Sequence, residues 1–271
     1  MNHREIVLYL VNIPFELVLC GLVYGRRLHR RFPLFAAYAT VFFTCTLCLG
    51  LIYHHFGYNS FTSYYAAWII SGVNLVGRCL AIAELCRDSL QEYKGIWGLS
   101  WRILGFLAAL FLANSAVDSW GQPDWIATYV LTIERDIGIS SAVLLFVILL
   151  ISMYYGVFLE PVQKGMAIGL FVLCVVDAVN NTVLRTIFTQ LIFSWSQMRL
   201  RAEEANDWWN AIRTFAFVGS MSIWCLALRK PLPAPNQEPE LLPAEIYAEV
   251  SPAVNLRLRA INDRLLELLK P

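Results

Sequence analysis

The chain has 271 residues, of which 58% are hydrophobic and only 15% are charged, and its mean hydropathy is +0.56. This composition excludes an ordinary water-soluble domain and predicts a protein that lies in a lipid bilayer. The net charge of +1 provides no overall attraction for a polyanion, so we expect no nucleic-acid partner.

Seven apolar runs are long enough to cross a hydrocarbon layer of about 30 Å, which takes about 20 helical residues. Backbone amides in hydrocarbon must be hydrogen-bonded within their own segment, so each run is expected to be a helix. The sequence therefore predicts an all-α polytopic membrane protein, with a bundle of seven transmembrane helices in residues 1–229. The runs cover approximately residues 6–24, 34–54, 64–86, 99–117, 126–158, 166–193 and 208–228.

Lysine and arginine are unevenly distributed between the connections. Four arginines lie in residues 26–31 after the first run, and residues 229–230 after the seventh run are both basic. By contrast, residues 54–63 and 118–125 contain neither lysine nor arginine. Positively charged connections stay on the cytoplasmic side. We therefore expect the N-terminus outside and the C-terminus in the cytoplasm, in a cell membrane (plasma or inner membrane).

After residue 229 the composition changes. Residues 230–251 are rich in proline and glutamate, which predicts an extended cytoplasmic linker. Residues 252–271 begin with helix-start chemistry and are expected to form an amphipathic helix. Two interpretations stay open for residues 252–270: binding to the inner membrane surface, or pairing with a cytoplasmic protein partner. The apolar seam of this helix consists of Val254, Leu258, Ile261, Leu265 and Leu268.

The run 166–193 carries a polar ladder. Asp177, Asn181 and Arg185 are spaced at i, i+4 and i+8, so a helix places them on one face. Ionisable residues inside a membrane are costly and mark functional sites by default. By depth along the helices, such residues fall into two groups. The midplane group, a candidate ligand or ion site, is Glu16, Asn74, Arg78, Asp177 and Asn181; the outer polar cluster is Glu134, Arg135, Asp136, Arg185 and Arg213.

The run 64–86 has one narrow polar face. Ser71, Asn74 and Arg78 share this face with the small residue Gly77, so the helix is expected to cross the bundle centre in close contact with its neighbours. The partners that we expect are Asp177 or Glu16 for Arg78, and Glu134 or Asp136 for either Arg185 or Arg213.

The sequence shows no catalytic constellation. All four histidines lie at chain ends or in connections, no lysine lies inside an apolar run, and the seven cysteines lie within or at the ends of such runs. The histidines argue against a buried zinc site, the lysines exclude a Schiff-base photoreceptor, and the cysteines are interpreted as small buried side chains. We expect no metal and no cofactor, and the balance is against an enzyme.

Three functions remain open. The leading hypothesis is a sensory or signalling protein that reads a small ligand, an ion or the membrane state through a polar cavity and relays it to the cytoplasmic helix. This topology is similar to that of many sensory receptors, in arrangement alone. A transporter or channel that uses intramembrane carboxylates is the second. A structural or assembly subunit, in which the charges only fix helix packing, is the third.

Overall fold

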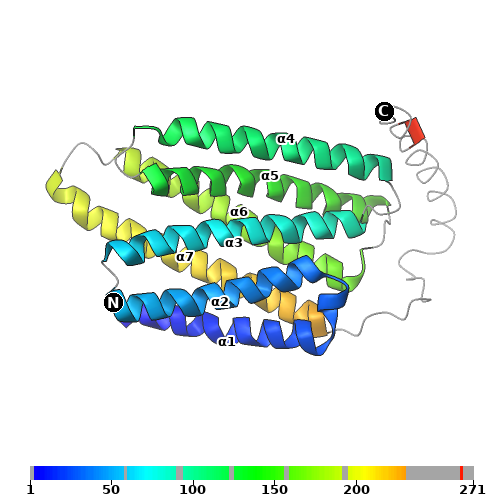
Figure 1. Cartoon of the computed structure of the whole chain (residues 1–271), viewed down its shortest axis with the longest axis horizontal. Helices are drawn as coiled ribbons and strands as arrows, with labels where there is room; N and C mark the ends of the chain where they lie inside the picture. Colours follow the sequence, from blue (N-terminus) through cyan, green and yellow to red (C-terminus); the bar gives the residue numbers. More distant parts are fainter. Residues whose placement is uncertain are drawn as a thin grey trace.

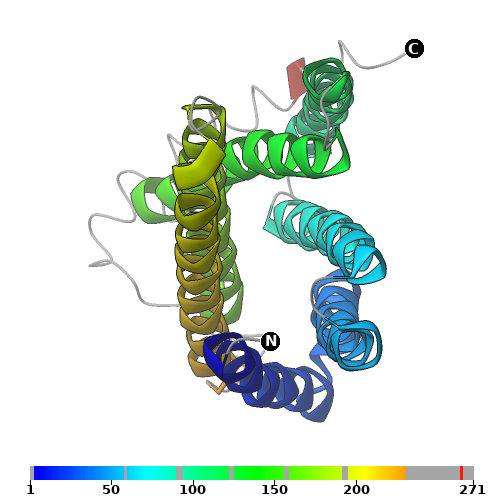
Figure 2. The same cartoon turned by 90° about the vertical axis from the view of Figure 1, so that its left-hand side faces the viewer.

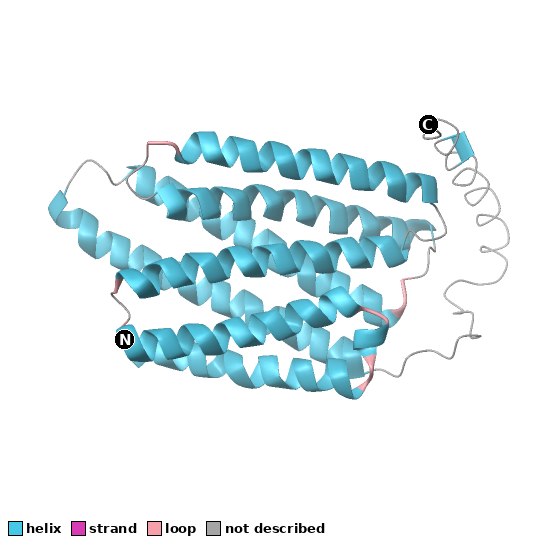
Figure 3. Ribbon diagram, in the orientation of Figure 1, coloured by secondary structure: helices cyan, strands magenta, loops and turns pink. Residues whose placement is uncertain are grey.

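The computed structural model describes residues 3–57, 60–89, 94–121, 125–155, 159–190, 195–229 and 263–264. Within these residues all regular structure is helical (Figure 3), which confirms the all-α prediction. Apart from Asp263 and Arg264, the predicted linker and amphipathic helix lie outside the described residues. The elements are α1 (His3–Gly25), η1 (Leu28–Arg30), α2 (Pro33–Phe56), α3 (Phe61–Ser89), α4 (Lys94–Ser119), α5 (Trp125–Tyr155), α6 (Pro161–Gln190) and α7 (Trp195–Arg229).

Five of the helices are long and apolar enough to cross a membrane, which supports an integral multi-pass protein. In α1, side chains are described only from Asn12 onward, and α5 carries three consecutive charges at residues 134–136. The seven-span count and the orientation therefore stay predictions. The five segments are Pro33–Phe56, Phe61–Ser89, Trp101–Ser119, Pro161–Val183 and Asn210–Arg229.

The helices run side by side along the long axis of the molecule (Figure 1) and form a ring when viewed from one end (Figure 2). Around this ring α1 contacts α2, α2 contacts α3, and α3 contacts both α5 and α6. The α6 helix packs along α7, and α7 returns to α1 and closes the ring. The α4 helix packs against α5 at the periphery. Side chains from helices far apart in sequence therefore meet inside the ring.

The distribution of polarity suits a bilayer. Large apolar side chains such as Phe61, Val117 and Phe215 are exposed, whereas the acids Glu134 and Asp177 are buried. An apolar exterior of this extent is unfavourable in water but is compatible with contact to lipid. The interior is thus the place where the chain concentrates its polar chemistry.

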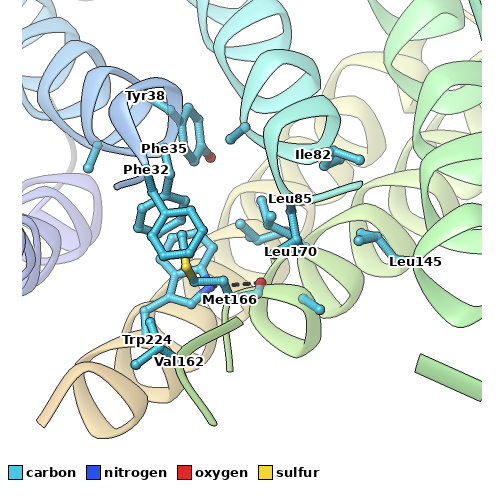
Figure 4. Close-up of a cluster of buried hydrophobic side chains, with 14 of the residues drawn as sticks. Phe32, Phe35, Tyr38, Ile82, Leu85, Leu145, Val162, Met166, Leu170 and Trp224 are labelled. Carbon is cyan, nitrogen blue, oxygen red and sulfur yellow. Dashed lines mark hydrogen bonds between the residues drawn. The ribbon is translucent and has the colours of Figure 1, made fainter. Parts of the chain in front are cut away.

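An aromatic cluster fixes α2 against α6 and α7 near one end of the ring (Figure 4). Trp224 is fully buried, and its indole Nε1 donates a hydrogen bond to the carbonyl oxygen of Met166 at 3.2 Å. Phe35 and Tyr38 meet the indole edge to face, at centroid distances of 5.3 and 6.3 Å. Gly169 leaves the space that the indole occupies, because a Cβ added there would lie 2.7 Å from Trp224 Cδ1.

The start of α2 is capped by another helix. Its N-cap residue is Phe32, which has no side-chain acceptor, and Pro33 occupies the first turn. The Glu84 carboxylate of α3 instead accepts hydrogen bonds from the backbone N–H groups of Leu34 and Phe35, with N–O distances of 3.0 and 2.8 Å. A carboxylate on free amides at the positive end of a helix is favourable, so this contact joins α2 to α3.

The arginines of the first connection tie the helix ends together. Arg31 binds Glu160 through two hydrogen bonds, Nη1 to Oε2 at 2.6 Å and Nη2 to Oε1 at 2.9 Å, and it lies 3.8 Å from Asp88 Oδ2. Arg26 donates to the carbonyl oxygen of Arg229 at 2.5 Å. The chain between α1 and α2 is thereby attached to the ends of α3 and α7 and to Glu160, just before α6.

Replacing Gly169 by alanine should destabilise the protein. The new methyl group overlaps a fully buried indole that has no space to move, and overpacking of this kind typically costs about 1–3 kcal/mol. Unfolding of the purified protein in mixed detergent micelles measures the loss. Gly105→Ala on α4 is the control, because its added Cβ meets no atom within 4 Å. Equal stability of the two variants would contradict this account of the α6–α7 contact.

Candidate functional site

A buried ion pair joins α3 to α6. The Arg78 guanidinium bonds through Nη1 to Asp177 Oδ2, and both side chains are buried. This pairing confirms the first of the two alternatives expected for Arg78. Gly77, beside Arg78, lets α2 approach closely, because a Cβ added there would lie 3.1 Å from Tyr38 Cδ2. The predicted role of the small residue in close packing is therefore confirmed as well.

Arg213 on α7 connects this pair to a second acid. Its Nη2 lies 3.3 Å from Glu134 Oε1 on α5, and its Nε lies 3.9 Å from Asp177 Oδ1. The expected pairing of Arg213 with Glu134 is thus confirmed. The four side chains alternate in charge, in the order Arg78, Asp177, Arg213 and Glu134, so their formal charges cancel. We call these four residues the charge network.

Neutral donors complete the coordination of Glu134. The Ser71 hydroxyl donates to Glu134 Oε1, and Asn181 Nδ2 donates to Oε2 at 3.2 Å. Arg213 Nη2 also donates to Ser71 Oγ, at 3.2 Å. Glu134 therefore accepts hydrogen bonds on both oxygens although it is only 1% exposed. A buried carboxylate is tolerated when charged and neutral donors replace its hydration in this way.

The charge network borders a cavity of about 140 Å³. One water molecule occupies about 30 Å³ in the liquid, so the cavity can hold a few water molecules or one small polar molecule. Two of its lining residues, Asn12 and Asn74, present a buried Oδ1 with no hydrogen-bond partner in the protein. The lining is formed by Asn12, Tyr38, Phe42, Asn74, Leu75, Arg78, Glu134, Leu173, Asp177, Asn210, Arg213, Thr214 and Phe217.

The structure distributes the midplane candidates unevenly. Asn74, Arg78 and Asp177 line the cavity, and Asn181 supports it from behind through Glu134. Glu16 does not line it; the Thr46 hydroxyl donates to Glu16 Oε1 at 3.1 Å, between α1 and α2. Their binding role stays a prediction.

The outer candidates also separate. Glu134 and Arg213 belong to the same cavity as the midplane residues, so the two predicted groups meet in one site. Arg135 and Asp136 pair with each other at 2.7 Å and do not line it. The side chain of Arg185 lies outside the described part of the structure.

Four polar lining residues, Asn12, Tyr38, Asn210 and Thr214, were not singled out by their sequence. Asn12 precedes Glu16 by one helical turn and Asn210 precedes Arg213 by three residues, so helical spacing from a charged residue is a signal for these two. Thr214 directly follows Arg213 and has no such spacing. Tyr38 has no such signal, because an aromatic side chain in an apolar run is usually part of the core. No group of metal-ligating side chains occurs among the described residues.

Removing one partner of the Arg78–Asp177 pair should cost much more than removing both. Neutral polar contacts between membrane helices are worth about 0.6–2 kcal/mol, whereas stranding one buried charge costs about 3–5 kcal/mol. We therefore expect Arg78→Met to lose about 3–5 kcal/mol of folding free energy, and the double variant with Asp177→Leu to lose less than Arg78→Met alone. Unfolding in mixed micelles provides the double-mutant cycle.

Arg31→Met is the matched control for that cycle. Arg31 also binds a carboxylate, but its side chain is 39% exposed, so its loss should cost only about 0–1 kcal/mol. If the double variant loses as much as both single variants together, the charges of Arg78 and Asp177 are not coupled.

Comparison of the chain with protein-family models, with curated proteins and with solved structures finds no match. The site must therefore be interpreted from its own geometry, which is that of a polar cavity between membrane helices with a balanced set of charges.

Proposed function

We propose that this multi-pass membrane protein is a sensory or signalling protein that binds a small polar ligand in the cavity beside the charge network. The observation that supports the proposal is that cavity, lined by opposite charges and by residues of α1, α2, α3, α5, α6 and α7. A ligand bound there contacts most of the ring at once. Its binding energy can therefore change how the helices pack.

The chemistry of the lining indicates the class of ligand. The charges of Arg78, Asp177, Arg213 and Glu134 cancel, so an uncharged or zwitterionic molecule enters without leaving an unbalanced charge in a medium of low polarity. The unpartnered oxygens of Asn12 and Asn74 call for hydrogen-bond donors. A small zwitterion or polyol meets both requirements.

Arg213 is the residue through which ligand binding could change the position of α7. Its side chain is 32% exposed, whereas its partner Glu134 is 1% exposed, so it is the more accessible member of that pair. A ligand that competes for its guanidinium weakens the contacts of α7 with α5 and α6. The α7 helix leads into the predicted linker and amphipathic helix, through which the signal is proposed to reach a partner or the inner membrane surface.

Ligand binding should be detectable as stabilisation. We expect at least one of glycine, β-alanine, glycerol and erythritol to raise the unfolding temperature of the full chain in lipid nanodiscs, because a ligand at 100 times its Kd adds about 2.7 kcal/mol. Asn74→Leu should abolish the effect, because it replaces the unpartnered amide by a larger apolar side chain and leaves the four charged residues in place. Thr182→Val, outside the cavity, is the control. If none of the four probes stabilises the protein, the structural-subunit alternative is favoured.

The relay requires a separate measurement. With a stabilising probe bound, hydrogen–deuterium exchange of residues 252–270 should change in the wild type and not in Asn74→Leu. Unchanged exchange despite stabilisation would retain the binding site and contradict the signalling role.

Transport of an ion or small polar solute is the second candidate function. Glu16 and Asp177 favour it, because buried carboxylates inside a membrane bundle are typical of ion and proton pathways. Proteoliposomes should then show uptake or current that Asp177→Asn reduces. Absence of flux for protons, sodium and the four probes would argue against this function.

A further inference from the structure

Glu16 is a buried acid that the charge network does not use. It is 1% exposed, and Oε1 accepts a hydrogen bond from the Thr46 hydroxyl at 3.1 Å. The other oxygen, Oε2, is buried and has no hydrogen-bond partner. Glu16 therefore differs from Glu134, which has an arginine, a serine and an asparagine as donors.

Among the side chains that the structure describes, none next to Glu16 supplies a positive charge. On α1, the neighbours one turn away are Asn12 and Cys20; from α2, the contact is the neutral Thr46. Two described arginines lie on α7, the other helix that packs on α1, and both are placed away from Glu16. Arg213 binds Glu134, and Arg229 lies at the end of α7, where its carbonyl oxygen accepts a hydrogen bond from Arg26, ten residues after Glu16.

An ionised carboxylate in this setting is energetically unfavourable. A charge without a partner in a medium of low polarity costs far more than a neutral polar group, and such groups bind a proton instead. In a protonated Glu16 the carbonyl oxygen accepts a hydrogen bond and the O–H group donates one. The Thr46 hydroxyl is the donor to the carbonyl oxygen. Protonation therefore removes the largest cost of placing Glu16 between α1 and α2.

The site has a connection to the cavity. Asn12 lies one helical turn from Glu16 on the same face of α1, lines the cavity and has an unpartnered Oδ1. Asn12 therefore places a polar side chain at the edge of the cavity, one helical turn from Glu16.

We infer that Glu16 is a proton-binding site of the membrane domain, separate from the charge network and one helical turn from Asn12, which lines the cavity. The Glu16 carboxylate takes up one proton from water to form a neutral carboxylic acid, and releases it to water at higher pH. This inference is independent of the ligand that occupies the cavity.

Infrared spectroscopy of the full chain in nanodiscs tests the inference. At neutral pH we expect a carbonyl stretch of a protonated carboxylic acid, which shifts when the protein is labelled with ¹³C-carboxyl glutamate and disappears reversibly as the pH is raised. Glu16→Gln should remove this band. Thr46→Val should move it to higher frequency, because the acid loses its hydrogen bond.

Asp136→Asn is the matched control. Asp136 is an acid on α5 with an arginine partner at 2.7 Å, so its replacement should leave the band unchanged. If Glu16→Gln fails to fold, the shift of the labelled band in Thr46→Val assigns it to Glu16, because the Thr46 hydroxyl donates to that carboxyl group. A spectrum without a glutamate-derived acid band, or a band that persists in folded Glu16→Gln or is removed at neutral pH by sodium chloride but not by choline chloride, would overturn the inference.

Discussion

The fold depends on one constraint: charges inside a bilayer need partners from other helices. Arg78, Asp177, Arg213 and Glu134 come from four different helices and satisfy one another in an alternating series. Each helix must then be oriented with one particular face inward, because rotating it would strand a charge. The charge network thus acts as a specification of packing as well as a polar site. These two roles do not exclude each other, since the same side chains border the cavity.

The rest of the ring is fixed by contacts of a different kind. The indole of Trp224 fills the space left by Gly169, and Glu84 caps α2 from the end of α3. Arg31 and Glu160 add a partly exposed pair at that end. Because membrane helices gain little from burial of apolar surface against each other, close packing and hydrogen bonds take the place of a hydrophobic driving force. The cavity lies among the same helices, where charged and amide side chains leave space between them.

Sequence reasoning predicted the parts that follow from polarity along one helix. Apolar length gave the helices, and the cost of intramembrane charge singled out Arg78, Asp177, Glu134 and Arg213 together with two of their pairings. It could not show that Glu134 and Arg213 share a cavity with Asp177. Depth along a helix does not determine how helices shift and cross, and Arg213 is long enough to join levels that residue counting separates. Tyr38 was not predicted, because it lies in an apolar run and becomes part of the site only through the packing of α2 against the other helices.

Glu16 shows the complementary failure. Its residue type and its depth along the helix predict a carboxylate that lines the cavity. In the structure Glu16 instead accepts a hydrogen bond from Thr46 between α1 and α2. The two kinds of acid have different consequences. The charge of an acid bound by arginine is balanced within the protein. An acid without a cationic partner can change its charge by binding or releasing one proton, and no arginine loses its partner when it does so. If Glu16 binds a proton as we infer, the membrane domain combines a frame of paired charges with a position on α1 at which its charge changes.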